Sequence, residues 1–270
     1  MPSRGGALPV KGSKWWIAAI LCLYCIQGTG LHAQIQDQTK RTILAVGAHA
    51  GDMEIAAGAL LASRSRAGDR IVLLHLTLGE SGNPRLSAEE YGKQKRREAE
   101  AAAKILRAET IFASYKDGEL PDSQEARKYV AGIIRTVRPT HVITHWRSGI
   151  HRDHIVTHAI VTDALLLASL PTAPTGEAAH REVRSVWFTE NWEDKENFSP
   201  YIYVDVSNGV EDWEKSVTQY EFIRGGISKF PYLDYYRALL KVRGAEGGVG
   251  YAECFDIGSW GKKQVYRSLP

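Results

Sequence analysis

Short apolar runs alternate with helical patterns from residue 42 to residue 170, and this alternation limits the possible folds more than any other feature. Four runs read as buried strands: residues 42–46, 70–76, 110–112 and 141–144. The segments that follow them read as helices: residues 54–67, 88–106, 123–138 and 154–170. Four strand–helix units in succession predict an α/β fold, a Rossmann-like three-layer α/β/α sandwich with a mostly parallel sheet.

The rest of the chain continues with less regular elements. Residues 186–188 and 201–206 resemble strands, and residues 210–222 and 232–242 resemble helices. With 44% hydrophobic residues in 270, the chain can bury one sizeable core. We therefore expect a single domain over residues 40–270.

The first 33 residues have a different pattern. Basic residues Arg4, Lys11 and Lys14 precede an apolar run over residues 15–26, and Leu-His-Ala ends at residue 33. That run is well short of the roughly 20 residues that span a bilayer. The pattern predicts a secretory signal peptide over residues 1–33, export to the periplasm or the exterior, and no stable membrane anchor after cleavage.

Charge and cysteine content narrow the possible partners. The formal net charge of +3 comes from the three basic residues of the signal segment, so the remaining chain is neutral. A neutral chain without blocks of Lys or Arg favours a small molecule or glycan as partner and argues against nucleic acid. Two of the three cysteines also lie in the signal segment, which leaves Cys254 without a partner for an internal disulfide.

Polar residues typical of a functional site follow three of the predicted parallel strands. His49 and Asp52 follow the first strand, Asp117 follows the third, and residues 148–154 follow the fourth. Ligands bind such sheets outside the carboxyl ends of the strands, so these loops should share one crevice.

The composition of two of these loops suits a metal ion. His49, Asp52 and His154 form a two-histidine, one-carboxylate set that leaves a coordination position open. An open position on zinc is what hydrolysis needs, although the same set also suits Fe²⁺. His151 is placed to donate a proton. The alternative for the first loop is a glycine-rich turn whose aspartate only caps a helix.

These motifs resemble those of the PIG-L/LmbE-like N-acetylglucosaminyl deacetylase family. Residues 48–54 read Ala-His-Ala-Gly-Asp-Met-Glu, where the family has Ala-His-Pro-Asp-Asp-x-Glu. Residues 151–154 read His-Arg-Asp-His, where the family has His-Pro-Asp-His. The similarity continues through five further stretches: residues 76–82, 95–99, 115–118, 204–206 and 243–255.

The resemblance implies an LmbE-like fold and a Zn²⁺ cofactor held by His49, Asp52 and His154. It also implies that His151 protonates the departing amine or steadies the oxyanion, and that Asp117 and a basic residue at or near Arg96 contact sugar hydroxyls. The implied substrate is a small N-acetylated amino sugar or a glycoconjugate. The implied products are acetate and the free amino sugar.

One departure from the family pattern matters for activity. The first aspartate of the family's pair acts as general base, and its position here is Gly51. Loss of a general base typically lowers the rate by about 10² to 10⁴. Three residues could replace it: Glu54, Asp153 or His151. Alternatively, Glu54 is only a carboxylate favoured by a helix N-terminus, and Asp153 only orients a ligand histidine.

Three functional hypotheses remain open from the sequence. The chain is an N-acetyl sugar deacetylase with a relocated base, or a catalytically impaired member that binds a sugar or metal. In the third hypothesis, the space at Gly51 admits an acyl group bulkier than acetyl.

Overall fold

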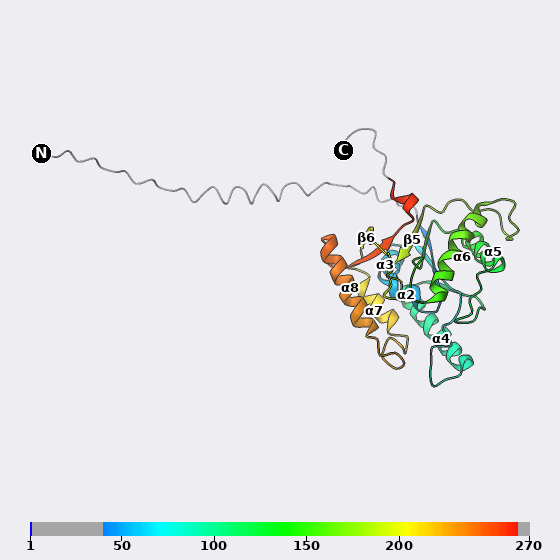
Figure 1. Cartoon of the computed structure of the whole chain (residues 1–270), viewed down its shortest axis with the longest axis horizontal. Coiled ribbons are helices and arrows are strands. Elements are labelled where there is room, and N and C mark those ends of the chain that lie inside the picture. Colours follow the sequence, from blue (N-terminus) through cyan, green and yellow to red (C-terminus); the bar gives the residue numbers. More distant parts are fainter. Residues whose placement is uncertain (2–39, 264–270) are drawn as a thin grey trace. The chain divides into compact units, whose positions relative to one another are not determined.

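The computed structural model describes Met1 and residues 40–263. Apart from Met1, the expected signal peptide lies outside the described residues. In the described part, seven strands form one sheet in the order β3-β2-β1-β4-β5-β7-β6 (Figure 1). The strands are β1 (Thr42–Gly47), β2 (Arg70–His75), β3 (Glu109–Phe112), β4 (His141–Thr144), β5 (Ser185–Thr189), β6 (Ile202–Asp205) and β7 (Ala252–Asp256).

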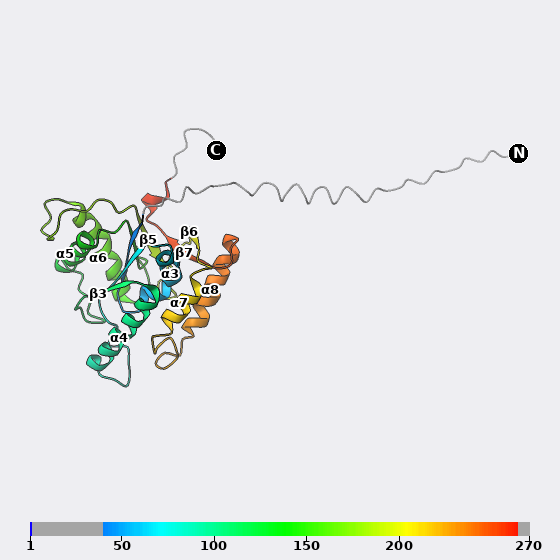
Figure 2. The same ribbon diagram turned by 180° about the vertical axis from the view of Figure 1, so that it is seen from behind.

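The helices of the described part cover both faces of this sheet. They are α2 (Asp52–Ala56), α3 (Gly58–Arg66), α4 (Ala88–Leu106), α5 (Gln124–Val137), α6 (Arg152–Ser169), α7 (Val210–Val217) and α8 (Tyr232–Gly247), followed by the 3₁₀ helix η1 (Ser259–Lys262). Helices α5 and α6 lie together on one side, and α7 and α8 lie on the other (Figures 1 and 2). No helix among the described residues is long and apolar enough to cross a membrane.

The predicted α/β/α sandwich is confirmed, with a parallel sheet that turns mixed at one edge. β3, β2, β1, β4 and β5 are parallel neighbours. β7 runs antiparallel to both β5 and β6. The carboxyl ends of the five parallel strands therefore share one edge, where the polar loops were expected to meet.

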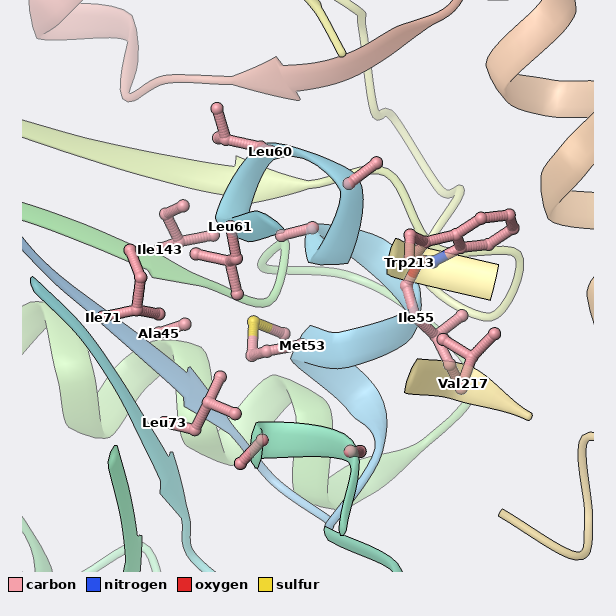
Figure 3. Packing of buried hydrophobic residues seen from close by; sticks show 14 of the residues in the cluster. Ala45, Met53, Ile55, Leu60, Leu61, Ile71, Leu73, Ile143, Trp213 and Val217 are labelled. Atoms are coloured by element: carbon pink, nitrogen blue, oxygen red, sulfur yellow. The ribbon is translucent and has the colours of Figure 1, made fainter. Parts of the chain in front are cut away.

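Alternating side chains of the central strands supply two cores. Ile43 and Ala45 face one side, where they join Met53, Leu61 and Trp213 (Figure 3). Leu44 and Val46 face the other side and pack with residues of α5 and α6. Because successive strand residues point to opposite faces, a fully apolar strand such as β1 buries both of its faces.

The predicted helix 54–67 is interrupted at Ala57. Two distant side chains form hydrogen bonds with backbone N–H and C=O groups that would bond to one another in an unbroken helix. Trp213 Nε1 donates to the Ile55 carbonyl over 3.2 Å. The Glu253 carboxylate accepts from the N–H groups of Ala59 and Leu60, each over 2.9 Å. The result is two short helices, α2 and α3.

Two further differences concern the C-terminal part. The helix predicted over residues 210–222 ends at Val217, and the segment that follows brings Tyr220 and Phe222 beside Gly51. Strand β7 was not predicted from the sequence, although all five of its residues are buried.

Candidate active site

His49, Asp52 and His154 meet at the carboxyl edge of the sheet. His49 follows β1, Asp52 begins α2, and His154 lies in the first turn of α6. His49 Nδ1 lies 3.2 Å from Asp52 Oδ2 and 3.3 Å from His154 Nε2. His154 Nε2 lies 3.6 Å from Asp52 Oδ2. One atom from each of the three residues thus forms a nearly equilateral triangle.

The size of this triangle suits a tetrahedral metal ion. Zinc binds nitrogen and oxygen at about 2.1 Å, which places tetrahedral ligand atoms about 3.4 Å apart. The observed edges of 3.2, 3.3 and 3.6 Å bracket this separation. Two imidazoles and one carboxylate, with a cavity on the remaining side, are also an appropriate donor set. The residues present therefore fit a metal of this kind.

Carboxylates lie behind both histidine rings, and the one behind His154 is hydrogen-bonded to it. His49 Nε2 lies 3.1 Å from Asp117 Oδ1 and 3.7 Å from Asp153 Oδ2. His154 Nδ1 lies 3.1 Å from both carboxylate oxygens of Asp194. A carboxylate behind an imidazole fixes its tautomer and leaves the other nitrogen free to bind a metal.

His145 is part of the same network, although sequence reasoning did not place it in the site. Its ring is fully buried, with Nε2 lying 3.1 Å from Asp52 Oδ2 and Nδ1 lying 3.1 Å from Asp194 Oδ2. Burial opposes protonation, but the hydrogen bonds to both carboxylates raise the pKa of His145 to about 9. His145 thus connects two carboxylates of the site.

The side chains of the site are largely buried, and they carry an excess of negative charge. Burial lowers the pKa of His49, but Asp52, Asp117 and Asp153 together raise it well above its usual value. Burial opposes ionisation of Asp52, but His49 and His154 hold its pKa well below its usual range. Such an arrangement favours a cation at its centre, either protons or a metal ion.

His151 lies at the edge of the cavity as the N-cap residue of α6. Its Nδ1 accepts from the Asp153 N–H over 3.2 Å, so the neutral ring carries its proton on Nε2. Burial lowers the pKa of His151, and so do the neighbouring rings of His49 and His154. A neutral imidazole with an Nε2–H donor can hydrogen-bond a substrate, whereas proton transfer to an amine needs the imidazolium form.

The space beside Gly51, where the family has its general base, is filled by the rings of Phe222 and Tyr220. Gly51 has a φ of +109°, and a Cβ built there would lie 3.2 Å from Phe222 Cζ and 3.5 Å from Tyr220 Cζ. Lys95 Nζ lies 4.2 Å from the centroid of the Phe222 ring and donates to the Ala50 carbonyl over 2.5 Å. The space that Gly51 was expected to open is therefore occupied, which removes the reason to expect a bulkier acyl group there.

Glu54 is not placed to replace the missing base. Its side chain is 0% exposed and does not line the cavity, and Oε1 accepts from the Tyr220 hydroxyl over 2.6 Å. His75 Nε2 lies 3.6 Å from the same oxygen. The first turn of α2 points this carboxylate into the protein and away from the site cavity, a direction that the sequence motif does not reveal.

Asp153 is also engaged, and it lies beside His49 rather than beside its sequence neighbour His154. Its Oδ2 accepts from the Gly118 N–H over 2.8 Å, and its Oδ1 lies 3.2 Å from Arg152 Nη1. These contacts match the orienting role that was the alternative to proton transfer.

A cavity of about 200 Å³, named here the site cavity, opens in front of the triangle. Asp117 lines it. Arg96 instead lines a neighbouring cavity, and Lys95, the residue before it on α4, lines the site cavity. Glu193 lines the site cavity too, with Oε2 lying 3.8 Å from His154 Nδ1. Sequence reasoning missed Glu193 and Asp194, although both follow β5 at the same sheet edge as the other loops.

Comparisons with known proteins agree with this arrangement. Residues 44–165 match the family model described as PIG-L, GlcNAc-PI de-N-acetylase. A 1D-myo-inositol 2-acetamido-2-deoxy-alpha-D-glucopyranoside deacetylase of Thermomonospora curvata is 30% identical over 171 residues. That match covers 52% of this chain and 57% of the relative, so only a little over half of that relative's length is spanned.

A second relative is matched over more of its length. The diacetylchitobiose deacetylase of Thermococcus kodakarensis is 26% identical over 230 residues, which cover 79% of this chain and 81% of the relative. The crystal structure of GalB, the 4-carboxy-2-hydroxymuconate hydratase of Pseudomonas putida, has a TM-score of 0.75 at 20% identity. The match covers 85% of this chain and all of that structure, and it shows a shared fold. Residues 44–165 thus match the PIG-L family model, and the relatives that the chain resembles include two deacetylases of acetamido sugars.

Proposed function

We propose that this protein is a zinc-dependent hydrolase that removes the acetyl group from an N-acetylglucosamine-type amino sugar. The observation that carries the proposal is the triangle of His49 Nδ1, Asp52 Oδ2 and His154 Nε2, whose edges suit a tetrahedral ion with one open position. Relatives named as deacetylases of acetamido sugars support the same reaction.

When bound by these three residues, zinc would polarise the acetamide carbonyl and make water more acidic. The same donor set suits ferrous iron, so reconstitution with each metal is part of the test. Asp117, Asp153 and Asp194 would hold the two ligand rings in the orientation they already have.

His151 would serve as the proton donor. Its Nδ1 is occupied by the Asp153 N–H, so Nε2–H is the group left to face a substrate in the site cavity. From there it can hydrogen-bond the developing oxyanion, whereas passing a proton to the departing amine nitrogen would require the imidazolium form, in which Nδ1 also carries a proton.

The proton acceptor is the part of the mechanism that departs from the family. His151 has no free acceptor nitrogen, because Nδ1 already accepts from the Asp153 N–H and Nε2 carries the proton. With Gly51 in place of aspartate and Glu54 buried, the carboxylates that line the site cavity are those of Asp52, Asp117 and Glu193. Asp52 accepts from the His49 N–H and Asp117 accepts from the Ser81 N–H, whereas no backbone N–H of the described residues donates to the Glu193 carboxylate. Glu193 is therefore the candidate for accepting a proton from water.

The second candidate function is a sugar- or metal-binding protein without turnover. The observation that favours it is the replacement of the family's carboxylate by the ring of Phe222, with the Lys95 ammonium beside it. Such a protein would retain its metal and bind acetamido sugars but release no acetate.

The decisive experiment measures acetate release from N-acetylglucosamine, diacetylchitobiose and an inositol-linked N-acetylglucosamine by the zinc-loaded and iron-loaded protein. His154→Ala provides the blank, and Glu193→Gln and His151→Ala locate the proton acceptor and donor. Release by the native protein that the blank lacks would support the deacetylase. Tight sugar binding by calorimetry without acetate release would instead support the binding protein. If the protein neither bound the sugars nor released acetate, both candidate functions would be refuted.

We also propose export, on the basis of the charged and apolar pattern of residues 1–33. The test is N-terminal sequencing of protein recovered from cell fractions. A mature N-terminus near Gln34 in the periplasm or the medium is expected, whereas an intact Met1 in the cytoplasm would contradict export.

A further inference from the structure

The loop after β5 brings acidic groups to the site and has no regular structure of its own. Residues 190–201 lie between β5 and β6 and contain no helix or strand. Glu193 in this loop lines the site cavity, and Asp194 lies 3.1 Å from His154 Nδ1. The position of Glu193 therefore depends on contacts that other elements make with the loop.

The hydroxyl of Tyr236 on α8 contacts this loop at two points. It donates to Asn191 Oδ1 over 2.9 Å and accepts from the Trp192 N–H over 3.3 Å. Asn191 Oδ1 in turn accepts from the Glu193 N–H over 3.1 Å. Tyr236 is 4% exposed and Asn191 is 6% exposed, so these bonds form away from solvent. One buried amide oxygen thus links the Tyr236 hydroxyl to the backbone of Glu193.

Other contacts anchor the loop on either side of these residues. Arg243, also on α8, binds Glu190 through two hydrogen bonds of 2.8 and 2.5 Å. From the loop after β4, the Ile150 N–H donates to the Glu193 carbonyl over 3.0 Å. Loss of the Tyr236 hydroxyl would therefore free the middle of this stretch, whereas both of its ends stay anchored. The expected effect is a local displacement and not unfolding of the protein.

We propose that Tyr236 is a positioning residue that holds Glu193 in the site cavity through Asn191. The inference rests on the proposed function, in which Glu193 accepts a proton from water. A proton acceptor acts only within hydrogen-bond reach of the proton, and a misplacement of about 1 Å can lower a rate about 10²-fold. Removal of the hydroxyl would leave the Trp192 N–H without its partner and take one of two donors from Asn191 Oδ1. The segment that carries Glu193 should then shift.

Amide hydrogen exchange, followed by NMR, tests the position of the loop without catalysis. Tyr236→Phe keeps the ring and removes the hydroxyl. Tyr235→Phe is the matched control, because Tyr235 is the neighbouring residue on α8 and its buried hydroxyl has no hydrogen-bond partner among the described residues. In the zinc-loaded protein, we expect the N–H groups of Trp192 and Glu193 to exchange about tenfold faster in Tyr236→Phe and at the native rate in Tyr235→Phe. Native exchange rates in Tyr236→Phe would overturn the inference.

Kinetics test whether Tyr236 acts through Glu193. Tyr236→Phe should lower kcat for acetate release about 10- to 100-fold with KM nearly unchanged. The same substitution added to Glu193→Gln should lower the remaining rate much less, because no carboxylate is left to position. An equal fractional loss in both backgrounds would show that Tyr236 supports the fold alone, and would overturn the inference. If the native protein released no acetate, the proposed function would fail, and the exchange rates would decide the role of Tyr236 on their own.

Discussion

The ring of Phe222 occupies the space that a side chain at position 51 would enter, since a Cβ on Gly51 would lie 3.2 Å from Phe222 Cζ. The backbone at Gly51 also has a φ of +109°, which residues with a Cβ rarely adopt. We therefore expect Gly51→Asp alone to destabilise the protein by about 1–3 kcal/mol and to leave acetate release no faster.

The double variant Gly51→Asp with Phe222→Ala should behave differently, because it frees the space for a carboxylate. An increase in kcat of about 10² or more over the Phe222→Ala single variant is expected if the restored aspartate accepts the proton. Thermal unfolding of all three variants checks folding. An equal gain from Gly51→Asp alone would show that Phe222 does not obstruct the position.

Asp194 should control metal affinity although it lies behind His154. Its carboxylate is fully buried and lies 3.1 Å from both His154 Nδ1 and His145 Nδ1. Asp194→Asn should weaken zinc binding about 10- to 100-fold, measured by competition with a chelator of known affinity. Asp163→Asn, an exposed acid on α6 that pairs with Arg127, is the control and should bind zinc normally. Normal zinc affinity in Asp194→Asn would show that His154 is not oriented by this contact.

Gly209 should tolerate no side chain, because a Cβ there would lie 2.0 Å from the Ala59 carbonyl oxygen. Backbone cannot move aside as a flexible side chain can, so Gly209→Ala should lower the free energy of unfolding by about 3 kcal/mol. Gly247→Ala is the matched comparison. Its Cβ would meet only Tyr203, at 3.6 Å, and alanine in α8 should be neutral or stabilising by up to about 1 kcal/mol. Urea unfolding measures the free energy of unfolding of both variants. Equal values for Gly209→Ala and Gly247→Ala would refute the close approach of α7 to α3.

Glu253 should make stability depend on pH. Burial raises the pKa of this carboxyl to about 8, although the N–H groups of Ala59 and Leu60 oppose the shift. Between its unfolded value, near 4.5, and about 8, the folded protein holds a proton that the unfolded chain has released. The free energy of unfolding should therefore fall as pH rises through this window. The free energy of unfolding, measured with urea from about pH 5 to 9, should change less with pH in Glu253→Gln than in the native protein. The same pH dependence in both would contradict the raised pKa.

The sequence predicted the parallel half of the fold closely because its strands and helices are regular. Helix 88–106 and strand 141–144 have the predicted bounds, since apolar spacing and capping residues act locally. The break at Ala57 could not be predicted, because the groups that satisfy it belong to Trp213 and Glu253, far away in the sequence. The buried strand β7 follows a glycine-rich segment and also escaped prediction.

The candidate site, like the fold, could be predicted from the sequence only in part. His49, Asp52 and His154 come together as the rule for parallel strand ends predicts, and their binding of zinc stays a prediction. The positions of Glu54 and Arg96 depend on which way a helical turn faces, which motif spacing does not specify. Phe222 fills the space at Gly51 from a segment that the sequence assigned to a helix, so the obstruction could be seen only in three dimensions.

Strand β7 has a consequence for how the chain matures. Among the described residues it is the last strand, yet it lies between β5 and β6, and its Glu253 carboxylate accepts the N–H groups of Ala59 and Leu60 in the first turn of α3. A nascent chain can therefore assemble β1 to β4 while it is still being made, but β6 has no neighbour in the sheet until residues 252–256 emerge. Completion of the sheet must therefore wait until residues 252–256 are available to pair with both β5 and β6.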